Sequence, residues 1–244
     1  MVELNKLTDR KLNVITAVIL TAIVSGVIAV CFLPGDVVVI SNGESYSAIY
    51  NGDRKSKKIS LTFNVYEGAE IVEGILGVLE EEGVKATFYI GGCWADDNEK
   101  VLSEIAGSGN ELGNHGYFHR NHKKLDYDGN YNEINAADAV ITALSGIKPV
   151  LFAPPSGSFS ALTLNAAADL GYKVIMWSKD TIDWRDSDEK KLISRATDKL
   201  SGGDIILMHP KKHTLKVLPE IIKRIKAQGY EIVTVGENIR DSAA

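Results

Sequence analysis

The chain has 244 residues, of which 45% are hydrophobic and 24% are charged. This length and apolar content suit one globular domain with a sizeable core. The formal net charge is -5, and positive and negative residues are mixed along the sequence without a basic stripe. We therefore expect no nucleic-acid partner.

The first 34 residues differ in composition from the rest of the chain. The segment 13–34 has no charged residue, and its length matches the about 20 apolar residues that cross a bilayer. Three basic residues precede it, which predicts a cytoplasmic N-terminus and an exported remainder. Residues 1–34 are thus predicted to be a cytoplasmic tail with a transmembrane signal-anchor, so that the protein is single-pass in the cell membrane with its larger part outside. A cleaved signal peptide is the alternative, although its apolar core is usually about 7–15 residues long.

Residues 35–57 hold two short β-branched runs, and we predict a linker or a small outer hairpin there. From residue 58 onward, strand and helix signals alternate. The predicted strands are residues 58–63, 86–92, 111–115, 150–154, 173–178, 204–209 and 231–235. The predicted helices are residues 70–82, 97–107, 130–145, 160–170, 188–200 and 214–228. Such alternation predicts an α/β fold with a parallel sheet, closed or nearly closed into a barrel.

Polar motifs follow five of the predicted strands. In chain order they read NVYEG, NHGYFH, APPSG, KDTIDW and HP. In (β/α) barrels the active site lies at the C-terminal ends of the strands. The five segments are therefore expected to converge on one rim.

His115 and His119 are four residues apart in NHGYFH. On a helical turn this spacing directs both rings to one side, and two neutral imidazoles are good ligands for zinc or a similar divalent ion. A pair of surface histidines in a loop is the alternative. We expect His122 to be a surface residue rather than a third ligand. Neither Cys31 nor Cys93 predicts a disulfide framework or a cysteine-ligated zinc site, because Cys31 lies within the apolar segment.

Two further segments contain acid–base candidates. His209 ends the predicted strand 204–209, where a histidine is either half-buried or a general acid or base. Asp180 lies just past the strand 173–178, and its carboxylate is suited to orient a histidine. For Asp183 we favour a structural role as a turn or N-cap carboxylate, and we expect His213 to be solvated.

The segment 153–159, APPSGSF, is a turn with two prolines and a glycine. Its backbone N–H groups suit the binding of an oxyanion, and a plain loop is the alternative. The aromatic side chains of Trp177, Trp184 and Phe159 form either a sugar platform or part of the core.

Together these residues resemble the polysaccharide deacetylases, the NodB-homology family or carbohydrate esterase family four, over residues 58–240. The resemblance implies a distorted seven-stranded (β/α) barrel. It assigns His115 and His119 to an H-S/T-x-x-H motif that binds a metal, most often zinc. Three residues match the motif that lines the groove and helps to form the oxyanion hole: Pro155, Ser156 and Gly157. The resemblance also places Asp180 and Trp184 in a D-x-x-x-W motif, and Leu207 and His209 in an L-x-H motif that supplies the acid.

The chain departs from this family at two motifs. The family's TFDDG motif holds the base and one metal ligand, whereas here Asn64 and Val65 stand at the two aspartate positions. Ala153 replaces the arginine that holds the base. Two glutamates follow, and we predict that Glu70 replaces the missing ligand, although an acidic residue there is also favoured by the helix dipole. Two histidines and one glutamate would form an open zinc site.

The expected function is the metal-dependent removal of N-acetyl groups, or less readily O-acetyl groups, from an extracellular amino-sugar polymer such as peptidoglycan. In this hypothesis zinc activates the water, and His209, held by Asp180, protonates the leaving amine. One alternative is a catalytically impaired protein that binds a glycan or has a structural role in the envelope. Another is a related hydrolase that acts on a small non-sugar amide.

Overall fold

The structure is a computed structural model that describes residues 16, 18–21, 37–41 and 44–240. It divides into two units, Met1–Asp36 and Val37–Ala244. In the first unit the described residues 16 and 18–21 are helical. The predicted transmembrane segment 13–34 lies largely outside the described residues. Among the residues that are described, no helix is long and apolar enough to cross a membrane.

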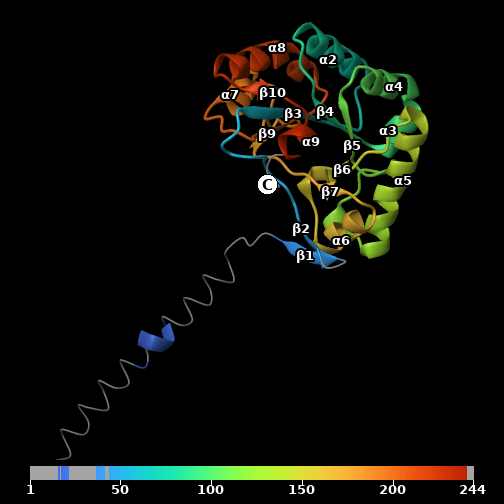
Figure 1. Ribbon diagram of the computed structural model, residues 1–244, viewed down its shortest axis with the longest axis vertical. Coiled ribbons are helices and arrows are strands. Elements are labelled where there is room, and N and C mark those ends of the chain that lie inside the picture. The colour runs from blue at the N-terminus through green and yellow to red at the C-terminus, as the bar shows by residue number, and fades with distance from the viewer. Residues whose placement is uncertain (1–15, 17, 22–36, 42–43, 241–244) are drawn as a thin grey trace, which may run out of the picture. The chain divides into compact units, whose positions relative to one another are not determined.

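The second unit contains a curled parallel sheet (Figure 1). Its strands are β3 (Lys58–Val65), β4 (Thr87–Ile90), β5 (Glu111–Asn114), β6 (Leu151–Phe152), β7 (Lys173–Val174), β8 (Lys179–Asp180), β9 (Ile205–Met208) and β10 (Glu231–Ile232). They lie in the order β7-β6-β5-β4-β3-β9-β8, and β10 also pairs with β3. Every pairing in the sheet is parallel. The predicted α/β class is confirmed, and the curled sheet fits a (β/α) barrel that is open between β7 and β8.

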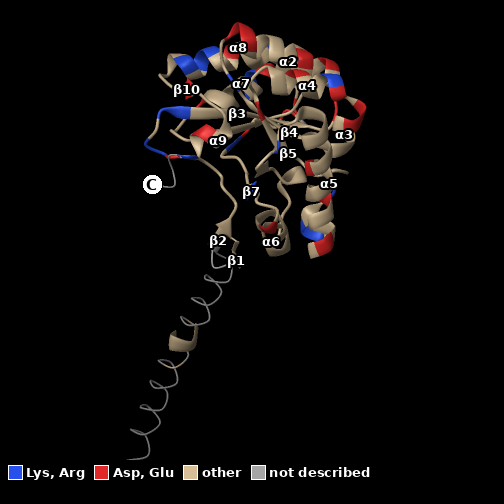
Figure 2. Cartoon of the chain, turned by 45° about the vertical axis from the view of Figure 1, so that its right-hand side comes forward, with Lys and Arg blue, Asp and Glu red and all other residues tan. Residues whose placement is uncertain are grey.

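Helices connect the strands and cover the outside of the sheet (Figure 1). They are α2 (Ala69–Glu81), α3 (Gly92–Asp97), α4 (Glu99–Gly107), α5 (Tyr127–Ser145), α6 (Ala161–Asp169), α7 (Glu189–Thr197), α8 (Lys212–Ala227) and the short α9 (Val235–Asn238). Two 3-10 turns, η1 (His122–Lys124) and η2 (Pro155–Gly157), lie in the loops. Helix α2 shows why the helices pack as they do, because Val72, Ile75 and Leu79 recur on one buried face. Figure 2 shows acidic and basic residues interspersed over the outer helices.

The centre of the sheet has an apolar face that packs into the core. Leu61, Phe63 and Phe88 are fully buried, as are Ile206 and Met208 on the neighbouring strand β9. The rings of Phe63 and Phe88 stack with their centroids 5.1 Å apart. Strand β9 is a continuous hydrophobic run, as is typical of a strand that is buried on both faces. Along β3, apolar residues alternate with the buried Ser60, Thr62 and Asn64. This packed centre fixes the strand ends from which the polar motifs emerge.

The predicted strand 173–178 is a strand of the sheet only at its start. Residues 173–174 pair with β6 as β7, whereas residues 179–180, just beyond the predicted strand, pair with β9 as β8 on the opposite edge of the opening. The intervening residues cross the gap between the edges. Ile175 forms a bridge with Ile49, and the Met176 N–H donates to the Ile49 carbonyl at 2.8 Å. The apolar run is therefore continuous in sequence but changes its partner strand halfway.

The segment before β3 is part of this barrel. Strands β1 (Val38–Ser41) and β2 (Glu44–Ser47) pair as an antiparallel hairpin. The following strap, residues 48–54, runs across the opening, where the Gly52 N–H donates to the Gly203 carbonyl at 2.8 Å. The Arg54 guanidinium lies 2.5 Å from the Asp204 carboxylate. Although we predicted that the folded domain begins at residue 58, the strap already pairs with residues on both sides of the opening.

Candidate active site

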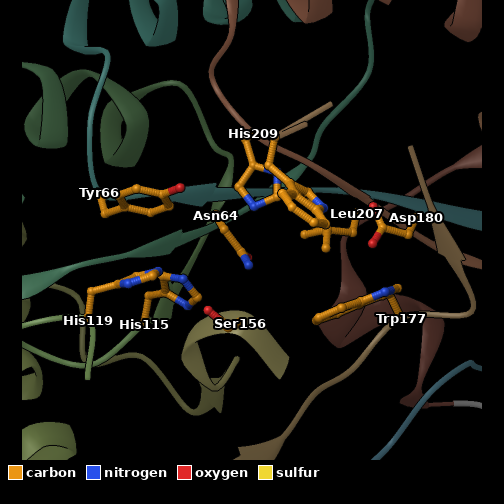
Figure 3. A pocket seen from close by; sticks show the side chains of 10 residues that line it. Asn64, Tyr66, His115, His119, Ser156, Trp177, Asp180, Leu207 and His209 are labelled. Carbon is orange, nitrogen blue, oxygen red and sulfur yellow. The ribbon is translucent and has the colours of Figure 1, made fainter. Parts of the chain in front are cut away.

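A pocket of about 290 Å³ lies at the C-terminal ends of the strands (Figure 3). The residues around it come from all five predicted rim segments, as the strand-end rule requires. They are Asn64, Tyr66, His115, His119, Ser156, Trp177, Asp180, Trp184, Leu207 and His209. The predicted convergence is confirmed, and the pocket is at the small end of the about 300–1,000 Å³ that ligand sites occupy.

His115 directly follows β5 and is fully buried. Its Nδ1 lies 2.7 Å from the Ala153 carbonyl oxygen, which accepts, so Nδ1 carries the proton. Nε2 is then an acceptor, and it has no hydrogen-bond partner among the described residues. Burial, followed by the charge of His119, lowers the pKa of His115 well below its ordinary value. This ring is therefore neutral at pH 7, and its Nε2 has an unprotonated lone pair, the state that a metal ligand needs.

His119 reaches the same pocket through a loop and not through a helical turn. Its φ is 55°, and Gly116 before it also has a positive φ of 74°. The two histidine ring centroids are 5.1 Å apart. Burial lowers the pKa of His119 as well. The i, i+4 spacing thus gave the correct proximity although the backbone that produces it is irregular.

Tyr66 packs against both histidines and was not predicted as a site residue. Its ring centroid is 4.2 Å from that of His119 and 6.2 Å from that of His115 (Figure 3). Burial and the nearby Glu67 charge raise its pKa, so the phenol keeps its proton at neutral pH. The signal for this residue was the family motif itself, because TFDDG ends in glycine where this chain has Tyr66.

The residues at this pocket do not fit the family's metal ion. Among the described residues, no three His, Cys, Asp or Glu side chains form a group that could hold a metal. Val65 packs in the hydrophobic core, and Asn64 supplies a neutral amide in place of a carboxylate. Glu70 is exposed in the first turn of α2 and does not line the pocket, so the predicted site with Glu70 as third ligand is wrong. The other glutamate, Glu67, forms an ion pair with Lys211.

His209 is held by Asp183 and not by Asp180. The His209 Nδ1–H donates to one Asp183 oxygen at 2.7 Å, and the His209 backbone N–H donates to the other at 2.7 Å. The Thr214 hydroxyl donates to that second oxygen, also at 2.7 Å. Burial alone would raise the pKa of Asp183, but the hydrogen bonds and charge of His209 lower it overall. Asp183 therefore stays ionised and leaves the His209 Nε2 as the nitrogen available to the pocket.

Asp180 has a separate place at the edge of the pocket. One of its carboxylate oxygens accepts the Ile182 N–H at 2.7 Å, which is a turn contact. Ile182 has a positive φ of 58°, and the reversal carries the chain on to the buried Asp183. The prediction that Asp180 orients His209 is thus wrong, and the structural role expected of Asp183 is wrong with it.

The groove turn is a poorer oxyanion site than predicted. Pro155 has no N–H, and the Gly157 N–H donates to the Pro154 carbonyl at 2.9 Å. Only the Ser156 N–H remains as a donor from this turn. Gly157 has a φ of 62°, and a Cβ there would lie 2.7 Å from the Trp177 ring. Glycine at 157 therefore allows the turn to press against that ring.

Two tryptophans line one side of the pocket. Trp177 is partly buried, whereas Trp184 is 52% exposed with the Arg185 guanidinium 5.3 Å from its ring centroid. Phe159 packs instead against a cluster around Phe152, away from the pocket. An exposed tryptophan beside a pocket is suited to stack on a sugar ring.

Two other histidines differ from the prediction. His122 is fully buried, with Nδ1 2.8 Å from the Asn130 amide oxygen, and burial lowers its pKa to about 4. His213 is partly buried, with Nε2 2.8 Å from the Asp183 carbonyl oxygen. Both are supporting residues behind the pocket, not solvated surface groups.

A curled parallel barrel with histidines and aromatic side chains at the strand ends is an arrangement that sugar-processing hydrolases use. The polysaccharide deacetylase family model matches residues 51–175, about half of the chain. The chain belongs to the polysaccharide deacetylase family, as its motifs predicted.

Both curated proteins and solved structures resemble the chain. It is 36% identical over 189 residues to the uncharacterized protein YlxY of Bacillus subtilis, which covers 78% of this chain and 59% of that protein. It is 29% identical over 197 residues to a peptidoglycan-N-acetylglucosamine deacetylase of Bacillus cereus, covering 79% and 72% of the two chains. A crystal structure of BA3943 from Bacillus anthracis, described as a CE4 family pseudoenzyme, matches with a TM-score of 0.79. That match has 36% identity and covers 82% of this chain and 71% of the other.

Proposed function

We propose that this protein recognises an N-acetylated glycan of the cell envelope and does not hydrolyse it. One observation carries this proposal: Tyr66 packs over His119 at 4.2 Å, in a site that has lost the two aspartates and the arginine of its family. The resemblance assigns the activation of water to a base carboxylate and a metal with three ligands, and this pocket lacks both. The pocket and its exposed Trp184 remain suited to a sugar.

Peptidoglycan is the polymer that we propose as the ligand. The Bacillus cereus relative is named for the deacetylation of a peptidoglycan sugar. The BA3943 structure is described as a pseudoenzyme, and the structure of one of its mutants as having restored enzymatic activity. Structures that are described as those of a CE4 family pseudoenzyme support a family member that has lost turnover. If the apolar segment 13–34 is a membrane anchor, as its composition predicts, the barrel meets this polymer outside the membrane.

Hydrolysis of the acetamide is the second candidate function. It is favoured by the His209–Asp183 pair, whose 2.7 Å hydrogen bond keeps His209 oriented as a proton-transfer group. In this alternative, His209 Nε2–H protonates the leaving amine, as in the family. At the position of the family's base, Asn64 has an amide, which cannot take the proton from water.

A paired measurement on one sample separates the two functions. Calorimetry gives the affinity for N-acetylated chitotetraose and for soluble peptidoglycan fragments, and an enzymatic acetate assay follows the same mixtures for a day. We expect binding without acetate release above the buffer blank, and weaker binding by Trp184→Ala. Acetate release that disappears in His209→Ala would establish the hydrolase instead. No affinity for either glycan would refute the proposed function.

A further inference from the structure

We propose that Tyr66 takes the place of the metal ion in this pocket and that its hydroxyl binds the acyl oxygen of the ligand's acetamido group. This inference rests on the proposed function and specifies which chemical group of the glycan is recognised. A metal in a deacetylase would polarise the acetyl carbonyl, so the group that replaces it must also present positive character to that oxygen. A phenolic O–H is a neutral donor of this kind.

The position of Tyr66 supports the first part of the proposal. Its ring lies against the two histidines that would otherwise share a metal, 4.2 Å from His119 and 6.2 Å from His115. In Figure 3 the hydroxyl oxygen points into the pocket, toward the His209 ring. The Tyr66 and His209 ring centroids are 6.3 Å apart in an edge arrangement. The phenol thus lies between the His115–His119 pair on one side and His209 on the other.

The loop that carries Tyr66 is fixed at both ends. On one side Val65 ends β3 and is buried in the core. On the other side Gly68 has a φ of 77°, and a Cβ there would lie 2.9 Å from the Pro210 carbonyl oxygen. The ion pair between Glu67 and Lys211 joins the same loop to the segment after β9. Tyr66 is therefore held in place before any ligand arrives, which lowers the entropic cost of binding.

The polar atoms around the ring match an acetamide. The Tyr66 hydroxyl makes no hydrogen bond to a described residue, and it is free to donate. The Asn64 Oδ1 and the His115 Nε2 also lack partners in the described part of the chain, but both atoms are buried, so the Tyr66 hydroxyl is the group that we propose for recognition of the acetyl carbonyl. An acetamido group has one carbonyl acceptor, which this hydroxyl can satisfy. A free amino sugar lacks the carbonyl and leaves the phenol without a partner.

The apolar lining and the size of the pocket are consistent with this pose. Leu207 and Trp177 offer an apolar surface to the acetyl methyl group. A pocket of about 290 Å³ has room for about one sugar residue, and the next residue of the polymer would lie over the exposed Trp184. The proposed ligand is therefore one N-acetylated residue within a longer glycan.

The first experiment compares N-acetylated chitotetraose with its fully de-N-acetylated form. Calorimetric titrations use the parent protein, Tyr66→Phe and the matched control Tyr127→Phe, whose hydroxyl bonds Asp169 on the surface. We expect Tyr66→Phe to weaken binding of the acetylated sugar about tenfold and to leave the deacetylated sugar unaffected. The control should behave as the parent. The phenylalanine keeps the ring, and circular dichroism verifies that both variants are folded.

The outcomes distinguish this inference from the proposed function. If the parent binds both sugars equally, or if Tyr66→Phe binds the acetylated sugar as the parent does, glycan binding stands and the role of Tyr66 is refuted. If the parent binds neither sugar, the proposed function itself fails, and the ligand half of this inference fails with it.

A zinc titration tests the first half of the proposal without any glycan. We expect no uptake by the parent, and tighter zinc binding by Asn64→Asp/Tyr66→Gly than by Asn64→Asp alone, because Asn64 lines the pocket and only the double variant removes the ring. Tight zinc binding by the parent that is lost in His115→Ala would overturn the replacement of the metal by Tyr66. Equal affinity in the single and double variants, or no affinity in either, would overturn it too.

Discussion

Replacing Asp183 with asparagine should change both the stability of the barrel and the proton position on His209. The carboxylate is 1% exposed and accepts three hydrogen bonds of 2.7 Å, two from His209 and one from Thr214. Asparagine keeps one acceptor oxygen, which must face the His209 backbone N–H because that group can only donate. Its NH₂ then faces Nδ1, and the imidazole must move its proton to Nε2.

The magnitude follows from the loss of charge. Hydrogen bonds to an ionised group contribute about 1.5–3 kcal/mol, against about 1 kcal/mol for neutral pairs. Weakening three such bonds in Asp183→Asn should lower the free energy of unfolding by about 3 kcal/mol. For a domain of this size, each kcal/mol shifts the midpoint of thermal unfolding by about 2–4 °C. We therefore expect a decrease of about 6–12 °C.

Thermal unfolding followed by circular dichroism measures the first effect, and ¹⁵N chemical shifts of the His209 ring measure the second. Asp180→Asn is the matched control, because the asparagine oxygen still accepts the one Ile182 N–H and the site is half-buried. The control should change stability by less than about 0.5 kcal/mol. Equal destabilisation by the two variants, or an Nδ1 that keeps its proton in Asp183→Asn, would refute the assignment of Asp183.

Burial lowers the pKa of His122 from 6.5 to about 4. Between these pH values the folded state keeps His122 neutral, whereas the unfolded chain takes up a proton there. The free energy of unfolding should therefore fall by up to about 3 kcal/mol as the pH drops from about 6.5 to 4. Urea titrations at several pH values check this, and an unchanged slope in His122→Gln would contradict it. Gly157→Ala places a Cβ 2.7 Å from Trp177 at a φ of 62°, so it should lower the free energy of unfolding by about 2–4 kcal/mol and alter the tryptophan fluorescence. The control Gly146→Ala has a φ of 71° and no atom within 4 Å of the new Cβ, so it should lower the free energy of unfolding by about 1 kcal/mol. Trp184→Ala should weaken glycan binding about tenfold in calorimetry. Because the Trp184 side chain is 52% exposed, the free energy of unfolding should stay within about 0.5 kcal/mol of the parent value. An unchanged affinity would rule out the role of Trp184 as a sugar platform.

The sequence predicted the fold well where the signals are local. Every predicted strand from residue 58 onward contains a strand of the structure, because buried parallel strands are apolar runs bounded by turn residues. The strand 173–178 was predicted too long, and β8 was missed. Both errors have one cause: the partner of this run changes from β6 to the strap and then to β9, and no local pattern reports such a change.

For the site, the resemblance located the histidines, the groove turn and the altered positions. It could not decide between Asp180 and Asp183, because the choice depends on the positive φ of Ile182 that reverses the chain between them. Glu70 is not a ligand because it lies on the exposed side of the first turn of α2. The length of a glutamate side chain shows how far it can extend, but the sequence does not show toward which side it points. Tyr66 could not be predicted from the resemblance, because it stands at the glycine of the TFDDG motif, which has no side chain and therefore no assigned role.

The strap across the barrel opening gives the chain a mechanical property. Ile49 is bonded on both sides to the β7 edge, through the Val174 carbonyl at 2.9 Å and the Met176 N–H at 2.8 Å. Tension transmitted along the chain from the N-terminal side meets the β1–β2 hairpin first and these hydrogen bonds next. Because they lie at the end of the strand whose continuation carries Trp177, we expect pulling on the N-terminal side to loosen the Trp177 wall of the pocket before it disturbs the histidines.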